Sequence, residues 1–116
     1  MSFDGGCHCG AVKFSVEAEL PKKARSCNCS ICRQKGLLLS FFSADKFILA
    51  TGQDALTTYE FNAHKIQHRF CKVCGSQPFA FGKNPDGSDM RAVNLRCVPS
   101  VDLESLELQH FDGASK

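Results

Sequence analysis

The sequence lacks a long apolar run and an excess of charge of one sign. No apolar stretch reaches the roughly 18 residues that a membrane-spanning helix needs, and residues 1–6 show neither the basic head nor the apolar segment of a secretion signal. The 14 basic and 12 acidic residues are interspersed, so the broad basic field of a sequence-independent nucleic-acid binder is absent. We therefore expect a cytoplasmic protein with no membrane span and no nucleic-acid partner.

Several catalytic motifs are also missing. The sequence contains no Gly-x-Ser-x-Gly elbow, no Walker A loop, no dinucleotide-binding fingerprint and no His-Glu-x-x-His pair. Serine hydrolase, nucleotide-dependent and zincin chemistry therefore have no support. What is abundant is cysteine, which occupies 8 of the 116 positions. Because a chain without a secretion signal is expected to keep its thiols reduced, this number indicates metal binding or thiol chemistry rather than disulfides.

Chain length and the spacing of apolar residues predict one mainly β domain over residues 1–116. Chains divide into several domains only beyond about 250 residues. Strand-like segments, marked by alternation or by β-branched and aromatic residues, occur at 11–16, 37–42, 47–50, 56–61, 66–70, 90–98 and 108–111. Their short separations favour antiparallel hairpins and leave no room for crossover helices. We expect the segments 37–42, 47–50 and 56–61 to be consecutive neighbours in a sheet.

Helical structure is expected at one place, near the C-terminus. Residues 101–106 are helix-like, and Asp102 is the expected cap. Residues 27–36 are too short for a packed helix, although Ser30 could cap a single turn and Gly36 could end it. We expect a cysteine knuckle followed by a turn in that segment.

Two short cysteine pairs that each end in glycine predict a structural metal site. They are Cys7-His8-Cys9-Gly10 and Cys71-Lys72-Val73-Cys74-Gly75. A structural zinc ion takes four ligands in a tetrahedron, and each turn with closely spaced cysteines supplies two of them. Glycine suits such a turn because it tolerates a positive φ and lets backbone N–H groups approach the thiolates. The alternative is that these four cysteines merely pack in the core.

Cys27, Cys29 and Cys32 form a C-x-C-x-x-C segment that offers three thiolates. A closed structural site uses four protein ligands, whereas a catalytic zinc keeps three and leaves the fourth position for water or substrate. Three thiolates also make the centre soft and negatively charged overall, which suits a thiol substrate better than an activated water. The segment therefore predicts a second metal site that a small thiol could enter.

The fourth ligand and the proton carrier of this second site are open at this point. Cys97, His64 or His68 could complete it as a second structural site, or the three thiols could do redox work without a metal. His68 is also a candidate general acid or base, since histidine titrates near neutral pH. The eighth thiol, Cys97, follows Val93 and Leu95 in alternation, which predicts that it packs in the core.

Motifs that together span nearly the whole chain carry a family resemblance. They are Gly6-Cys7-His8-Cys9-Gly10-Ala11-Val12, Cys27-Asn28-Cys29-Ser30-Ile31-Cys32-Arg33, Phe70-Cys71-Lys72-Val73-Cys74-Gly75 and Val93-Asn94-Leu95-Arg96-Cys97, followed by Phe111-Asp112-Gly113. In these motifs the chain resembles the glutathione-dependent formaldehyde-activating enzyme (GFA) family, also called the centromere protein V family. The resemblance implies an Mss4-like, mainly antiparallel β fold with two zinc ions. It assigns the structural zinc to Cys7, Cys9, Cys71 and Cys74, and a second, catalytic-type zinc to Cys27, Cys29 and Cys32.

The resemblance also implies a reaction. In it a carbon–sulfur lyase joins glutathione and formaldehyde as S-hydroxymethylglutathione, or separates them, with the thiol on the second zinc and His68 or a water moving the proton. Basic residues near that segment could attract the carboxylates of glutathione; they are Lys22, Lys23, Arg25, Arg33 and Lys35. Two other classes remain open, a non-catalytic zinc-binding module that binds glutathione or another thiol, and a cysteine redox switch.

Overall fold

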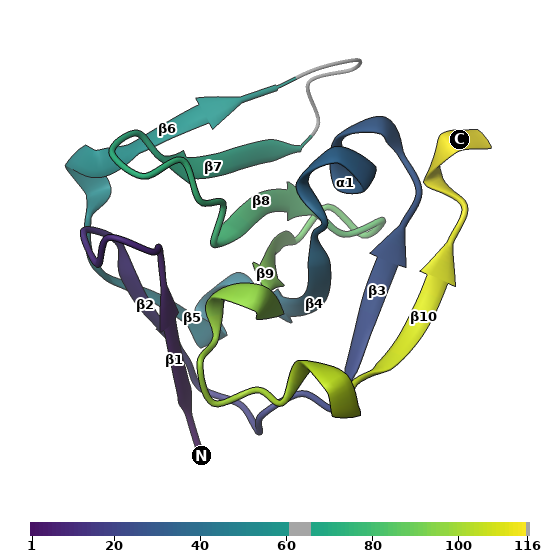
Figure 1. The fold of residues 1–116 in the computed structure, drawn as a ribbon, viewed down its shortest axis with the longest axis horizontal. Helices are drawn as coiled ribbons and strands as arrows, with labels where there is room; N and C mark the ends of the chain where they lie inside the picture. Colours follow the sequence, from purple (N-terminus) through teal and green to yellow (C-terminus); the bar gives the residue numbers. More distant parts are fainter. Residues whose placement is uncertain (61–65, 116) are drawn as a thin grey trace.

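The computed structural model describes residues 1–60 and 66–115 and arranges their strands in two sheets (Figure 1). The larger sheet has the order β10-β3-β4-β9-β8-β7-β6, and the smaller sheet has the order β1-β2-β5. The strands are β1 (Phe3–Gly6), β2 (Lys13–Val16), β3 (Lys23–Cys27), β4 (Leu38–Ser43), β5 (Phe47–Thr51), β6 (Leu56–Tyr59), β7 (Gln67–Cys71), β8 (Phe79–Lys83), β9 (Asp89–Asn94) and β10 (Glu107–Phe111). The prediction of a mainly β fold is confirmed.

The core lies between the two sheets and is rich in phenylalanine. Along β2 the side chains alternate, with Phe14 and Val16 buried and Lys13 exposed, as expected for a strand with one face on a core. Phe14 packs edge-to-face on Phe79 of β8 with ring centroids 5.6 Å apart, and Phe47 of β5 packs on the same ring at 4.9 Å. Because Phe79 is completely buried, this aromatic layer holds the smaller sheet against the larger one.

One short α-helix, α1 (Ser30–Lys35), follows β3 where the sequence predicts only a turn. Cys29, rather than Ser30, is its N-cap residue, and Gly36 ends it in the left-handed conformation with a φ of 65°. The helix forms because Gly36 can donate its backbone N–H to the Cys32 carbonyl at 2.9 Å and so close the last turn. No helix within residues 1–60 and 66–115 has the length and apolar character needed to cross a membrane.

The helical segment expected near the C-terminus is a short 3-10 turn, η4 (Leu103–Ser105). Asp102 caps it as predicted, since its carboxylate accepts a hydrogen bond from the Glu104 N–H at 3.2 Å. Similar three-residue turns within the described chain are η1 (Ala44–Lys46), η2 (Gln53–Ala55), η3 (Leu95–Cys97) and η5 (Gly113–Ser115). These turns change the direction of the chain and bring distant strands together.

The strand pairing differs from the expected series of hairpins. β4 pairs with β9, β5 with β2 and β6 with β7, so three strands that follow one another in sequence are not neighbours in space. The turns η1 and η2 lie between them and carry the chain to the smaller sheet and back.

A second difference is that β10 runs parallel to β3 (Figure 1). After β9 the chain passes through η3 and η4 and returns to the end of the sheet at which β3 begins. There the Glu107 N–H donates a hydrogen bond to the Lys22 carbonyl at 3.0 Å. This return places the last strand beside Cys27, at the end of β3.

A pair of glycine substitutions tests how closely the loop after Cys9 packs. Gly52 has a φ of +98°, and a Cβ there would meet the Ala11 carbonyl oxygen and lie 2.6 Å from the Val12 Cα. Gly87 has a φ of +89° but open space around it. We expect Gly87→Ala to lower the free energy of unfolding by about 1 kcal/mol, for backbone strain alone, and Gly52→Ala to lower it by about 3 kcal/mol or more. Urea unfolding of the metal-loaded proteins measures both, and equal losses would contradict the expectation.

Candidate metal centres

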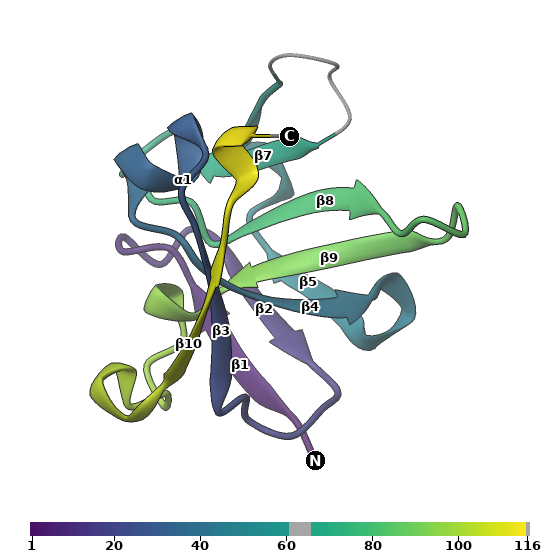
Figure 2. The ribbon, with the colours of Figure 1, turned by 90° about the vertical axis from the view of Figure 1, so that its right-hand side faces the viewer.

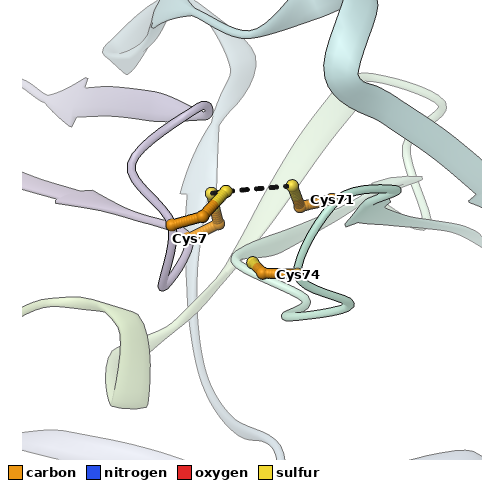
Figure 3. Close-up of side chains that lie close together, drawn as sticks. Cys7, Cys71 and Cys74 are labelled. Carbon is orange, nitrogen blue, oxygen red and sulfur yellow. Dashed lines mark hydrogen bonds between the residues drawn. The ribbon is translucent and has the colours of Figure 1, made fainter.

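The first cysteine cluster joins two loops that are far apart in sequence. Cys7 and Cys9 lie in the loop after β1, Cys71 ends β7 and Cys74 lies in the turn that follows. Their four sulfurs all lie within 4.8 Å of one another. Figure 3 shows Cys7, Cys71 and Cys74 pointing toward a common centre. The four residues singled out in the sequence are therefore brought together by the fold.

The spacing of these sulfurs fits a tetrahedral metal site. A tetrahedron with metal–sulfur bonds of about 2.3 Å has edges of about 3.8 Å. Cys9 Sγ lies 3.6 Å from Cys7 Sγ and 3.7 Å from Cys71 Sγ. Backbone N–H groups also point at the sulfurs, with Val12 donating to Cys7 Sγ at 3.2 Å and Val73 to Cys71 Sγ at 3.4 Å. Such N–H groups stabilise thiolates in the outer shell of a metal site.

The thiols of this cluster have unequal pKa values, and a cation bound among them would favour the thiolate form of all four. The backbone N–H groups of Ser76 and Cys9 lower the pKa of Cys74 to about 5. An N–H group of Ala11 also lowers the pKa of Cys9, but burial and hydrogen bonds to the neighbouring thiols outweigh it and raise the pKa to about 11. Several thiolates this close repel one another, whereas a divalent cation at the centre lets all four ionise. The pKa values of the thiols and the distances between the sulfurs therefore both suit a bound cation.

Gly10 and Gly75, the glycines that follow the two cysteine pairs of the first cluster, are required for their backbone conformation. Gly10 has a φ of +84° and Gly75 a φ of +81°. A Cβ at either position would meet nothing within 4 Å, so close approach is not the constraint. Positive φ lets each turn reverse tightly, with Gly10 N–H donating to the Cys7 carbonyl at 3.2 Å and Gly75 N–H to the Cys71 carbonyl at 2.8 Å.

The second cluster consists of Cys27, Cys29 and Cys32, whose sulfurs also lie within 4.8 Å of one another. Cys27 ends β3, Cys29 caps α1 and Cys32 lies in the first turn of that helix. The helix brings Cys29 and Cys32 together because residues three apart lie on one face. Cys27 and Cys29 are partly exposed and Cys32 is buried, so the cluster opens to the surface on one side.

The thiols of the second cluster also differ in pKa. Although burial acts against it, the Cys32 N–H and neighbouring groups lower the pKa of Cys29. Burial and repulsion from the Cys29 and Cys27 sulfurs raise the pKa of Cys32. Without a cation, one thiolate of this cluster keeps its neighbours protonated, and a metal ion held by all three would remove that conflict.

Within the described residues, the structure adds no fourth protein ligand to this cluster. His68 lies on β7 with 5% of its surface exposed, and its Nδ1 is 3.0 Å from Gln77 Nε2. Burial, with a smaller contribution from Lys35, lowers its pKa. His64 lies outside the described residues, and Cys97 belongs to neither cluster.

Cys97 does not occupy the core position that alternation predicts. β9 ends at Asn94, and Leu95–Cys97 forms the turn η3, so the period of two stops before Cys97. Its side chain is partly buried, with Sγ 3.6 Å from the Gln77 carbonyl oxygen, and burial raises the pKa of this thiol to about 11. A raised pKa disfavours the thiolate form, which is the form that reacts or binds a metal.

The chain after β10 closes over the second cluster and supplies residues that sequence reasoning missed. Asn28 Nδ2 donates to Asp112 Oδ1 at 3.0 Å, and the Ala114 N–H donates to Asn28 Oδ1 at 3.0 Å. A cavity of about 240 Å³ is formed there by Ser26, Cys27, Asn28, His110, Phe111 and Asp112. The Phe111-Asp112-Gly113 motif was the only signal in the sequence, and it carried no indication that it would meet Cys27.

We expect the two clusters to differ in what their loss does to the protein. Wild type should carry two metal ions per chain by elemental analysis. Cys27→Ser should carry one and stay folded, because α1 and β3 keep their other contacts. Cys71→Ser should lose the ion that joins the two sheets, and since a structural metal contributes on the order of 10 kcal/mol to small metal-dependent domains, it should unfold or melt far lower. Equal thermal stability of the two variants would contradict this assignment.

Gly113 offers a test that leaves every cysteine in place. A Cβ at Gly113 would lie 2.5 Å from Cys27 Sγ and 3.2 Å from Cys29 Cβ. Gly113→Ala should therefore displace the Cys27 sulfur and reduce the metal content from two ions per chain towards one. Gly87→Ala, which has open space, is the matched control and should retain both. Full metal content in Gly113→Ala would show that the C-terminal turn does not restrict the second cluster.

Comparison with known proteins agrees with this architecture. Residues 2–105 match the family model described as glutathione-dependent formaldehyde-activating enzyme. A Halomonas elongata protein provisionally named for that activity is 28% identical over 89 residues, which cover 70% of this chain and 57% of that protein, so the chain spans little more than half of that relative. The crystal structure of a Rhodobacter sphaeroides protein superposes with a TM-score of 0.80 and 28% identity, covering 93% of this chain and 99% of that one. The chain belongs to the glutathione-dependent formaldehyde-activating enzyme family.

Proposed function

We propose that this protein is a zinc-dependent carbon–sulfur lyase acting on a small thiol adduct such as S-hydroxymethylglutathione. The observation that carries the proposal is the contrast between the two clusters. One has four thiols and joins the two sheets, while the other has three, is partly exposed and lies beside a small cavity. Three protein ligands and an accessible fourth position are the arrangement of catalytic zinc sites.

Zinc is the metal that the donors favour. Thiolates are soft ligands, and a site made only of cysteine selects zinc or another soft metal over magnesium or calcium. In the proposal, Cys7, Cys9, Cys71 and Cys74 hold the structural zinc, and Cys27, Cys29 and Cys32 hold the second one. A zinc ion in the second cluster would lower the pKa of a thiol that binds beside it and so raise the thiolate fraction.

The proposed reaction needs no redox partner. In the forward direction the glutathione sulfur forms a bond to the formaldehyde carbon, the carbonyl π electrons move to oxygen, and the thiol proton ends on that oxygen. The reverse direction breaks the same carbon–sulfur bond. The cavity beside Cys27 would orient the thiol, and the polar residues on its wall are Ser26, Asn28, His110 and Asp112. Of the two proton carriers considered from the sequence, His68 or water, the burial of His68 favours water.

The proposed substrate and compartment agree with the state of the cysteines. All eight lie in the described part of the chain, and none of them is in a disulfide there. Reduced thiols at this density suit the cytoplasm, where glutathione is also the abundant small thiol. We therefore propose a cytoplasmic enzyme with glutathione, or a thiol like it, as its small-molecule partner.

Turnover by the zinc-loaded protein tests the proposal. We expect it to accelerate exchange between glutathione, formaldehyde and S-hydroxymethylglutathione, followed by exchange NMR, above the uncatalysed rate. Cys27→Ser should return the rate to the uncatalysed background because it removes a ligand of the second site. Cys97→Ser, which removes a thiol outside both clusters, should keep the wild-type rate.

The same protein distinguishes an enzyme from a binding module. Cobalt can replace zinc in thiolate sites and reports a new thiol ligand by its absorption spectrum. If glutathione changes that spectrum while the exchange rate stays at background, the proposed lyase activity is wrong and the domain binds thiols without turning them over.

A further inference from the structure

Two arginine side chains share one aromatic ring on the inner strands of the larger sheet. The Arg91 guanidinium carbon lies 3.8 Å from the centroid of the Phe81 ring, and that of Arg69 lies 4.9 Å from the same centroid. They come from β9 and β7, the two neighbours of β8, which carries Phe81. The sheet therefore holds two positive charges close together over a fixed apolar surface.

These two charges have no carboxylate partner among the described residues. The ion pairs seen in residues 1–60 and 66–115 are Lys23–Glu107 and Lys83–Asp89, and neither includes an arginine. Burial lowers the pKa of Arg91, Asp89 acts in the opposite direction, and Arg69 lowers it further. Like charges held near each other without a counterion destabilise a fold, so such a pair is typical of a place where an anion binds.

The donors of the pair are also incompletely used. A guanidinium group carries five N–H bonds in a planar fork. Arg91 donates from Nη1 to the Met90 carbonyl at 3.2 Å. The Nε of Arg69 is buried and has no hydrogen-bond partner in the described chain. A buried donor without a hydrogen-bond partner destabilises the fold, and an acceptor atom of a ligand that reached it would recover that loss.

A cavity adjoins Arg91 and Phe81 and is large enough for a small anion. It has a volume of about 940 Å³ and is lined on this side by Arg91, Phe81, Gln67 and Lys83. Its one acidic wall residue in the described chain, Asp89, is already paired with Lys83 at 2.7 Å. The cavity thus places the positive charge of Arg91 beside the apolar Phe81 ring, and Arg69, which is not among its wall residues, stacks on the same ring.

We propose that Arg69 and Arg91, stacked on Phe81, form an oxyanion-binding site for the carboxylate or phosphate group of a small molecule. Planar guanidinium groups bind both oxyanions through paired N–H···O hydrogen bonds, and a second arginine supplies the remaining charge. None of these three residues belongs to either cysteine cluster, although Arg69 lies two positions before Cys71 on β7. Figure 2 shows the β8–β9 hairpin extending to the side opposite α1, which carries Cys32.

Titration of the zinc-loaded protein with inorganic phosphate, followed by ¹H–¹⁵N NMR, tests the site without any activity measurement. We expect saturable shifts of the Arg69 and Arg91 Nε–H signals and of backbone signals in β7, β8 and β9. Arg69→Gln and Arg91→Gln should each weaken phosphate binding at least tenfold. Arg25→Gln is the matched control, because Arg25 also stacks on aromatic rings, at 4.5 Å from Phe41 and 4.4 Å from Phe111, with no second arginine on either ring among the described residues.

The outcomes separate the proposal from its alternatives. Unchanged Arg69 and Arg91 signals, or equal weakening by Arg25→Gln, would overturn it. If Arg69→Gln does not fold, Arg69→Lys keeps the charge but removes the fork, and it should still weaken binding severalfold.

A parallel titration with glutathione identifies the source of the oxyanion. Shifts of the same signals that phosphate competes away would assign the site to a carboxylate of the thiol. Shifts with phosphate alone would assign it to a phosphorylated ligand. Because the readout is independent of turnover, failure of this site and failure of the proposed lyase activity are distinguishable.

Discussion

The sulfurs of Cys9 and Cys71 meet across 62 positions of sequence and join the smaller sheet to the larger one. Without a cation, the four thiols of this cluster oppose each other's ionisation, as their divided pKa values show. A metal ion bound among them would replace the repulsion between thiolates with four metal–sulfur bonds. A chain of 116 residues has a modest core, so a metal cross-link at this position would contribute a large share of the free energy that holds the two sheets together.

The aromatic layer and the first cluster act together. Phe14 and Phe47 come from the smaller sheet and pack on Phe79 of the larger one. The four cysteines of the first cluster bring the end of β1 close to the end of β7. Packing alone would allow the small sheet to slide, because apolar contact is non-directional. Metal–sulfur geometry is directional, so a metal ion in the first cluster would fix the position of the smaller sheet on the larger one.

The second cluster is made differently, and this difference supports a separate role. Its three cysteines lie within six positions of one another, so β3 and α1 could present them without help from the rest of the chain. Within the described residues the fold brings no fourth cysteine to this cluster; instead, the C-terminal segment packs against it. The parallel strand β10 and the turn after it bring Asp112 and Gly113 against Asn28 and Cys27, which shapes a small cavity at the exposed side of the cluster.

The sequence by itself determined the features that depend on near neighbours. Alternating side chains identified most of the strands, and cysteine spacing with glycine at Gly10 and Gly75 identified both clusters, because strand period and knuckle geometry are properties of a few consecutive residues. Only the tertiary structure decided which strands pair, why β10 runs parallel to β3, and which groups lie beside Cys27. Those outcomes arise between residues up to about eighty positions apart, where the direction of each connection and the space left by other elements determine the contact, and neither is written in a local pattern.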